Sequence, residues 1–399
     1  LPISWGALLP YTPSGDGCER VHTLSRSPGG VLAWILFPDE TGAEIPARTF
    51  FLGSILAKEV FHMTKPIVLA YVVNRALINV TPDDAKRLTH VNIAFGLVGK
   101  DGLLDSHQLT NIDYIHTLRA FNPSLKVVLS VGGWGAGGFS TMALTEEGRR
   151  AFAESCREYV EKTGLDGIDI DWEYPCDNSA GIDCDPRDRE NFTLLLKALR
   201  DALGTERIVS IAAGAGKYFI EGTEMPRVAE ICDYVQLMTY DMRSGFCSQA
   251  GHHASLYPTK GDETARNTRD VVETFHEGGV PYEKIVIGAA FYARRWDGVP
   301  DVNHGMLQEA QTKGQGGPGY SELVQGFINK NGFTRYWDED ARAPYLFNGS
   351  TFISYEDPDS LRAKCEYLTA KGLLGIMYWE HGCDSTHTLL KSIADALER

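Results

Sequence analysis

The sequence predicts an α/β fold, a closed (β/α)8 barrel of the TIM type that carries a small α+β insertion. Two observations predict the barrel. Eight short apolar or β-branched runs alternate with helical patterns from about residue 66 onward, and the runs are continuously apolar, as parallel strands covered on both faces are. An open doubly wound sheet is the alternative, but no glycine-rich phosphate loop follows the first run.

The predicted strands are, in order, 66–72, 90–96, 126–134, 167–174, 207–214, 233–241, 284–292 and 374–380. Between them, apolar residues fall on one helical face over 152–160, 192–203 and 361–368. Gly164, Gly204 and Gly372 follow these three patterns and predict where each helix ends.

The spacing of the strands predicts the domain organisation. The interval from Lys284 to Leu373 spans 89 residues, far more than one helix needs, so we expect an α+β subdomain over 297–356. Within it, "YLFNGSTFISYED" is typical of two strands around an Asn-Gly turn. The catalytic barrel then comprises 63–296 and 357–399.

Residues 1–62 do not fit the repeat and form an N-terminal extension in one interpretation. In the other, the natural start is Met63, because "KEV" a few codons upstream can be encoded by a sequence resembling a ribosome-binding site. The chain shows no basic-then-apolar leader after Leu1, so either a leader has been removed or there was none.

Composition narrows the function classes. A net charge of −15 argues against nucleic acid as a partner, and no run of about 18 apolar residues predicts a membrane span. Eight cysteines are too few for a disulfide scaffold, although Cys176 and Cys184 could staple a loop or stay free thiols. No motif predicts a cofactor or metal, and we interpret the adjacent His252 and His253 as loop contacts.

The stretch "LDGIDIDWEYP" (165–175) places four acidic residues in eight positions of a predicted core strand. Because strand side chains alternate between faces, Asp169, Asp171 and Glu173 share one face. We expect that face to line the barrel channel and to rise toward its carboxyl end, where barrel enzymes do their chemistry. Asp166 has the opposite parity and is expected to position the strand.

Three neighbouring carboxylates in a low-dielectric channel cannot all ionise cheaply, so they must share protons and at least one pKa must rise. Glu173, the last of the three, is placed to be a protonated general acid near neutral pH. Asp171 could hydrogen-bond to it or to substrate, and Asp169 could hold the shared proton. A metal site of aligned carboxylates is an alternative, although no histidine falls beside them.

These residues resemble a known family. D-G-I-D-I-D-W-E (166–173) resembles the DxxDxDxE signature of family 18 glycoside hydrolases, the chitinases. "SVGG" (130–133) resembles that family's SxGG motif and "MTYD" (238–241) its MxYD motif. "FYAR" (291–294) resembles an F-Y-G-R motif, with Ala293 in place of glycine. The resemblance covers about 66–399 and extends to the subgroup with an α+β insertion between strands seven and eight.

The resemblance implies retaining, substrate-assisted hydrolysis, an exception to the two-carboxylate scheme. The N-acetyl oxygen of the substrate would be the nucleophile, and Glu173 the general acid/base. Asp171 would orient the acetamide, Tyr240 would hold its carbonyl, and Asp169 would join the proton shuttle. Further expected contacts to sugar or to the carboxylates are Trp379, Asp241, Met238, Tyr71, Ser130, Trp134, Tyr292, Arg294 and Trp296.

The resemblance thus implies a chitinase, endo-acting in preference to exo-acting, whose partners are chitin or N-acetylglucosamine oligosaccharides. We expect a monomer, and secretion because the substrate is a polymer; a start at Met63 without a leader would instead indicate the cytoplasm. Alternatives are an endo-β-N-acetylglucosaminidase acting on N-glycans or peptidoglycan, a metal-dependent barrel hydrolase, and a non-catalytic chitin-binding lectin. The lectin is disfavoured because Asp169, Asp171 and Glu173 are all present.

Overall fold

The computed structural model describes residues 24–26, 32–34, 66–262 and 265–398. The chain divides into two units, Leu1–Thr64 and Lys65–Arg399. In the first, β1 (Leu24–Arg26) pairs with β2 (Leu32–Trp34) in an antiparallel ladder. The rest of the predicted extension over 1–62, and the alternative start at Met63, lie outside the described residues.

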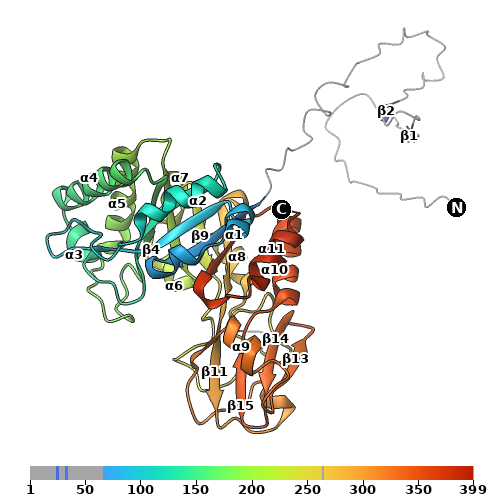
Figure 1. Ribbon diagram of the computed structural model, residues 1–399. Coiled ribbons are helices and arrows are strands. Elements are labelled where there is room, and N and C mark those ends of the chain that lie inside the picture. Colours follow the sequence, from blue (N-terminus) through green and yellow to red (C-terminus); the bar gives the residue numbers. More distant parts are fainter. Residues whose placement is uncertain (1–23, 27–31, 35–65, 263–264, 399) are drawn as a thin grey trace, which may run out of the picture. The chain divides into compact units, whose positions relative to one another are not determined.

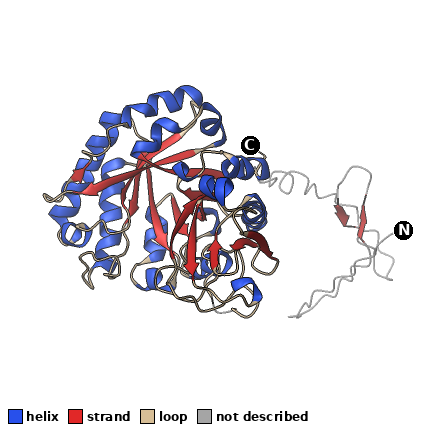
Figure 2. Cartoon of the chain, turned by 60° about the horizontal axis from the view of Figure 1, so that its bottom comes forward, coloured by secondary structure: helices blue, strands red, loops and turns tan. Residues whose placement is uncertain are grey.

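The second unit contains the predicted (β/α)8 barrel, whose strands radiate inside a ring of helices in Figure 2. All eight predicted strands are confirmed, and β3 pairs with both β4 and β16, which closes the sheet. The barrel strands are β3 (Ile67–Val73), β4 (His90–Val98), β6 (Lys126–Gly132), β7 (Gly167–Asp171), β8 (Ile208–Gly214), β9 (Tyr234–Met238), β10 (Ile285–Ala290) and β16 (Gly375–Trp379). A short β5 (Leu104–Asp105) pairs antiparallel with β4.

Helices follow the barrel strands and form the outer ring (Figure 1). The three helices predicted from apolar periodicity are α4 (Glu146–Thr163), α5 (Asp188–Leu203) and α10 (Pro358–Lys371), and each ends at its predicted glycine. The others are α1 (Pro82–Arg87), α2 (Ile115–Phe121), α3 (Phe139–Ala143), α6 (Lys217–Glu221), α7 (Met225–Ile231), α8 (Thr268–Glu277) and α11 (Thr388–Ala396). Short 3-10 turns include η1 (Asn74–Asn79), η2 (Ile112–Tyr114), η3 (Tyr282–Lys284), η4 (Asn303–Gly305) and η5 (His381–Cys383).

The apolar face of β7 packs under this ring. Ile168, Ile170 and Trp172 are at most 1% exposed. The Trp172 ring stacks on Phe139 at 5.3 Å and meets Phe192 of α5 edge-on at 5.9 Å. Burial of each such side chain stabilises the fold by roughly 1.5–3 kcal/mol. The apolar face of β7 therefore holds the strand in place and fixes the position of its acidic face.

Asp166 positions the start of β7, as its parity predicts. Its carboxylate accepts the backbone N–H of Val127 at 2.8 Å and pairs with the guanidinium of Arg119 at 2.7 Å. These contacts tie the first residues of β7 to the neighbouring strand β6.

An antiparallel sheet is inserted between β10 and β16, in the order β12-β11-β15-β14-β13. It comprises β11 (Tyr292–Asp297), β12 (Gln315–Gly319), β13 (Thr334–Asp338), β14 (Ala343–Phe347) and β15 (Thr351–Ser354), with α9 (Tyr320–Gly326). In Figure 1 it gathers below the barrel. The β14–β15 pair brackets Asn348 and Gly349 as predicted.

The sheet begins at Tyr292, ahead of the boundary that we predicted at residue 297. Sequence periodicity treats 284–292 as one strand because its apolar residues are unbroken. In the structure β10 ends at Ala290 and a new strand begins at Tyr292, which pairs with β15 and β12 instead of the barrel. Tyr292 and Arg294 therefore belong to the inserted sheet.

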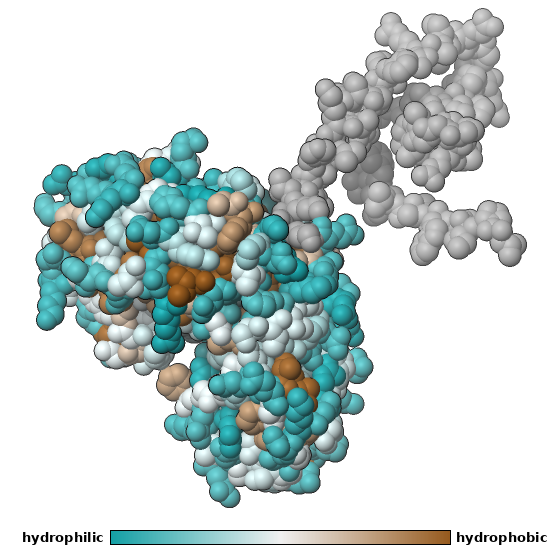
Figure 3. Space-filling view, viewed as in Figure 1, coloured by the Kyte–Doolittle hydropathy of each residue, from teal (hydrophilic) through white to brown (hydrophobic). Residues whose placement is uncertain are grey.

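The surface drawn in Figure 3 is mostly hydrophilic, with hydrophobic residues in small separate patches. Among the described residues, no helix combines the length and the hydropathy that a membrane crossing requires.

A buried ion pair joins the end of the insertion to the barrel. Lys364 Nζ lies 2.6 Å from Glu356 Oε1, and both side chains are 1% exposed. Lys364 also donates to the carbonyl of Gly288 on β10 at 3.2 Å, and Glu356 accepts the N–H of Ala290 at 3.2 Å. The pair thus fixes β10 at the point where the chain leaves the barrel.

Replacing Lys364 by methionine should lower the free energy of unfolding by about 3–5 kcal/mol, because it leaves the Glu356 carboxylate buried without a counter-charge. Guanidinium unfolding measures the change. Lys391→Met is the matched control: it removes a solvent-exposed pair with Asp395 and should change stability by at most about 1 kcal/mol. Equal losses in both variants would contradict this assignment.

Candidate active site

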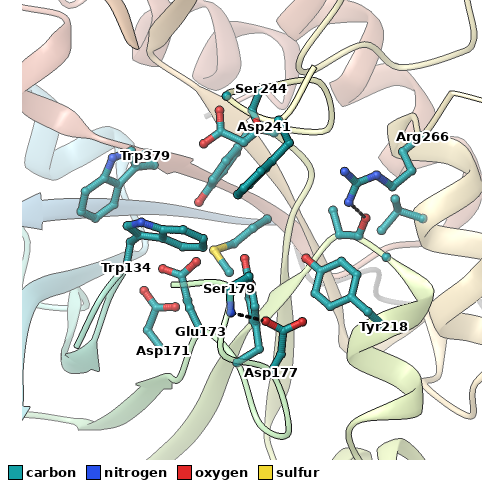
Figure 4. A pocket seen from close by; sticks show the side chains of 18 of the residues that line it. Trp134, Asp171, Glu173, Asp177, Ser179, Tyr218, Asp241, Ser244, Arg266 and Trp379 are labelled. Carbon is teal, nitrogen blue, oxygen red and sulfur yellow. Dashed lines mark hydrogen bonds between the residues drawn. The ribbon is translucent and has the colours of Figure 1, made fainter. Parts of the chain in front are cut away.

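The acidic face of β7 points into the barrel. Asp169 and Asp171 are 0% and 4% exposed, and Glu173, just beyond the strand, is 9% exposed. The alternation of faces therefore brings the three carboxylates to the inner side and the carboxyl end, as predicted. Figure 4 shows Asp171 and Glu173 side by side at the wall of a cavity.

Asp169 lies deepest and is surrounded by donors. Its Oδ2 accepts hydrogen bonds from the Tyr71 and Ser130 hydroxyls, both at 2.8 Å. Its Oδ1 accepts from the Ser210 hydroxyl and the Gln236 amide, also at 2.8 Å. Burial raises the pKa of Asp169, and the hydroxyl donors oppose that rise. The four donors on its two oxygens stabilise the ionised form and so moderate the rise in pKa, and the role of Asp169 in holding the shared proton stays a prediction.

Asp171 has no such shell. Its Oδ1 is buried and has no hydrogen-bond partner among the described residues. Burial, then the neighbouring charges of Glu173 and Asp169, raise the pKa of Asp171 well above its usual range. A buried oxygen without a partner is costly, so this atom is available to a donor on a bound molecule.

Burial also raises the pKa of Glu173, to about 7; the charge of Asp241 adds to the rise and a hydrogen bond from Tyr174 opposes it. A carboxyl group that is half-protonated near neutral pH can both donate and accept a proton. Glu173 thus has the titration behaviour that the sequence predicts for a general acid.

Asp241 behaves in the opposite way. Arg294 of β11 holds both of its oxygens, Nε to Oδ1 at 2.5 Å and Nη2 to Oδ2 at 2.6 Å, and His253 Nδ1 lies 3.5 Å from Oδ1. Although burial opposes it, hydrogen bonds from His253 and Arg294 hold the pKa of Asp241 well below its usual range. Asp241 is a fixed negative charge at the edge of the site.

The side chains of Tyr240 and Met377 lie next to each other at the carboxyl end of the barrel. The Tyr240 hydroxyl lies 3.8 Å from Met377 Sδ, and its ring meets Tyr292 edge-on at 6.0 Å. Burial and the charges of Asp171 and Glu173 raise the pKa of Tyr240 well above its usual range, so it stays a hydrogen-bond donor. Met238 ends β9 nearby, 8% exposed.

Aromatic rings form the floor and one rim. Trp379 ends β16, stacks on Phe95 at 5.4 Å and 19°, and lies 5.8 Å from the Tyr71 ring. Trp134 is 57% exposed and contacts Tyr174 edge-on at 6.4 Å. In Figure 4 both tryptophans lie on the same side of the cavity, next to Asp171 and Glu173. Exposed flat apolar faces beside carboxylates are suited to stacking against sugar rings.

One glycine of the "SVGG" stretch is required by this geometry. Gly132 has φ of +125°, and a Cβ atom there would lie 2.0 Å from the carbonyl oxygen of Asp171. Any larger residue would push β6 away from β7 opposite Asp171, two residues beyond the position where Ser130 reaches Asp169, so this glycine keeps the two strands in contact.

These side chains line a cavity of about 1110 Å³, which is large enough for an oligomeric ligand. Sequence reasoning did not find several of its lining residues. They include Phe95, Tyr174, Asp177, Ser179, Lys217, Tyr218, Phe246, Arg266 and Asp270. Phe246, in the loop after β9, is 75% exposed; its position gave a signal, since the loops that follow barrel strands carry the active site.

Some predicted residues lie elsewhere. Trp296 is fully buried in the insertion, where it packs on Phe352 and donates to the carbonyl of Cys247 at 3.0 Å, so it is not a sugar contact. His252 lies 3.3 Å from Asp338, whereas His253 faces Asp241, so the adjacent histidines have separate partners. Cys176 and Cys184 are free thiols.

Comparison with known proteins gives one family. The model of the glycosyl hydrolases family 18 matches residues 68–384. Chitinase A1 of Niallia circulans is 37% identical over 305 residues, 70% of this chain and 43% of that protein, so the chain spans under half of that relative. Chitotriosidase-1 of Mus musculus is 30% identical over 328 residues, 74% of this chain and 67% of that protein.

Solved structures with the same fold lead to the same family. A family 18 N-acetylglucosaminidase from Paenibacillus barengoltzii is 49% identical, with a TM-score of 0.81 over 83% of this chain and 99% of that one. Chitinase ChiW from a Paenibacillus species is 37% identical, with a TM-score of 0.79 over 84% of this chain and 43% of that one.

Because the pKa of Glu173 rises on folding from 4.5 to about 7, Glu173→Gln should stabilise the protein at alkaline pH. The wild-type carboxylate must ionise in a buried site above pH 7, which costs about 3 kcal/mol. The gain should grow from pH 4.5 to 7 and vanish below pH 4.5, as measured by denaturant unfolding across that range.

Glu273→Gln is the control, because Glu273 pairs with Lys371 at 2.8 Å and its pKa is lowered. That variant should give no stabilisation at any pH. A Glu173→Gln gain independent of pH would contradict the raised pKa.

Proposed function

Since the chain belongs to glycoside hydrolase family 18, we propose that it is a chitinase that cleaves β-1,4 bonds between N-acetylglucosamine units with retention. One observation carries the proposal: Glu173, with a pKa raised to about 7, lies in the cavity beside Asp171, whose Oδ1 lacks a partner among the described residues. A proton donor next to an unfilled acceptor fits a substrate that brings both a leaving oxygen and an N–H.

In the first step Glu173 protonates the glycosidic oxygen as the bond to C1 breaks. Glu173 then carries a negative charge, and it accepts a proton from the water that later attacks C1. The pKa of about 7 suits both steps, because neither protonation state is strongly favoured near neutral pH.

The nucleophile is the substrate's own N-acetyl oxygen, which forms a cyclic oxazolinium intermediate with C1. The acetamide N–H donates to Asp171 Oδ1, and this acceptor stabilises the positive charge that develops on the acetamide nitrogen. The Tyr240 hydroxyl donates to the acetamide oxygen and holds it in attack geometry. No carboxylate nucleophile is needed, which suits Asp169, since four donors already occupy its oxygens.

Ring stacking and charge hold the sugar chain. Trp379 forms the floor under the reacting sugar, and Phe95 stacks on the indole ring of Trp379 and supports it. Trp134, Tyr292 and the Arg294–Asp241 pair supply stacking surface and hydrogen-bonding groups at the rim. Met238 fills the space between the floor and the barrel wall.

Release of single N-acetylglucosamine units is a second candidate. The Paenibacillus barengoltzii structure that shares 49% identity with this chain is described as an N-acetylglucosaminidase, which favours exo action over the endo action predicted from sequence. Cleavage of N-glycans or peptidoglycan would use the same chemistry on a different chain. A polymeric substrate also supports secretion. The cavity is lined by residues of one chain, which supports action as a monomer.

Glu173→Gln should lower kcat on chitin oligomers about 10³-fold, since it removes the proton donor but keeps the shape of the site. Oligosaccharide binding measured by calorimetry should persist. Glu190→Gln, on the exposed face of α5, is the control and should leave kcat unchanged. Wild-type turnover in Glu173→Gln would refute the mechanism.

The acetyl group should be indispensable, because it supplies the nucleophile. The hexamer of N-acetylglucosamine should be cleaved, whereas fully deacetylated hexamer and cellohexaose should be cleaved at least about 10³-fold more slowly. Chromatography of the early products separates the two candidates: internal cleavage gives dimers to tetramers, and exo action gives monomers. Efficient hydrolysis of the deacetylated hexamer would rule out both.

A further inference from the structure

A second cluster of ligand-type side chains lies outside the cavity. Asp84 of α1 meets His381 of η5 and His387 at the start of α11, and one side-chain atom from each lies within 4.8 Å of the others. Helices α1 and α11 pack against each other beside the C-terminus (Figure 1). Nothing in the proposed hydrolysis uses these three residues.

The Asp84 carboxylate is fully buried and held in one orientation. Its Oδ2 accepts the Thr81 N–H at 3.1 Å and the Thr81 hydroxyl at 2.6 Å. Among the described residues, its Oδ1 has one hydrogen-bonding neighbour, His387 Nδ1 at 3.1 Å. Since a carboxylate oxygen accepts two partners, Oδ1 retains capacity for one more.

His381 is oriented from its other side. Its Nδ1 lies 3.0 Å from the Tyr378 hydroxyl, and its Nε2 points toward Asp84, 3.7 Å from Oδ2. That distance is too long for a hydrogen bond. A histidine that binds a metal commonly has its second ring nitrogen held by such a partner.

We propose that Asp84, His381 and His387 bind a divalent transition-metal ion, for which Zn²⁺ is the best chemical match. Two imidazoles and one carboxylate form a set that zinc accepts, and ligands about 2.0–2.2 Å from one ion lie roughly 3–3.7 Å apart. His387 Nδ1 lies 3.1 Å from Asp84 Oδ1, the oxygen with spare capacity, and His381 Nε2 lies 3.7 Å from Oδ2 of the same carboxylate, so both distances fall within that range.

The site has an entry path and a structural consequence. The His387 side chain is 36% exposed, so an ion can enter from solvent and keep a water ligand there. An ion would tie the segment after the last barrel strand, β16, to the helix after the first, β3. It would therefore fasten the closure of the barrel, two residues beyond Trp379.

The test compares Zn²⁺ binding in four versions of the full chain: the natural sequence, His387→Asn, His381→Asn and His107→Asn. His107 is the matched control, an exposed histidine that pairs with Asp105 at 2.7 Å and belongs to no three-ligand group among the described residues. After EDTA dialysis, calorimetry with Zn²⁺ and elemental analysis should give one equivalent in the natural chain and in the control. The ligand variants should bind at least about 100-fold more weakly.

Thermal unfolding gives an independent readout. Saturating Zn²⁺ should raise Tm in the natural chain and the control and leave His387→Asn unchanged. The proposal is overturned if the natural chain binds no Zn²⁺, or if Zn²⁺ binds equally to all four proteins. The first outcome needs no variant, so misfolding of His381→Asn would not weaken the test. Hydrolysis is not measured, so failure here is distinct from failure of the proposed function.

Discussion

Burial of several carboxylates in one barrel is the constraint on which the site depends. A charged group taken out of water must find donors or counter-charges, or else keep its proton. The active site uses all three solutions. Asp169 receives four neutral donors, Asp241 receives a guanidinium, and Asp171 and Glu173 receive too little to offset burial. Among these four carboxylates, only Asp171 and Glu173 therefore have strongly raised pKa values. Both line the open cavity, as does Asp241, whose charge is balanced by Arg294.

Sequence periodicity predicted the barrel because the relevant signals are local. Continuous apolar runs gave the strands, apolar faces followed by glycine gave α4, α5 and α10, and side-chain parity placed the three acids on one face. Of the four hydrogen-bond donors around Asp169, only two could be predicted from the sequence. Tyr71 and Ser130 came from the family resemblance, whereas Ser210 and Gln236 are ordinary residues within apolar runs, and only the register of β7, β8 and β9 turns them inward.

Long-range partners explain the remaining misses. Trp296 has the composition of a sugar contact, but the pairing of β11 with β15 buries it against Phe352. His252 and His253 are neighbours in sequence, yet their side chains have different partners: His252 contacts Asp338 and His253 contacts Asp241. Asp84 and His387 are separated by 303 positions, so no motif spacing could have brought them together. In each case the closed topology, not local composition, decides which side chains meet.

The origin of Arg294 affects how this architecture can change over generations or in the laboratory. Arg294 and Tyr292 belong to β11 of the inserted sheet, while their partners Asp241 and Tyr240 follow β9 of the barrel. The insertion supplies part of the active site, so recombination cannot replace it without affecting the barrel. A chimera that exchanged the whole subdomain at its structural boundary would strip the barrel of the cation that neutralises Asp241. Crossovers placed after Trp296 would keep that residue pair intact, so shuffling experiments should cut inside the sheet rather than at its edge.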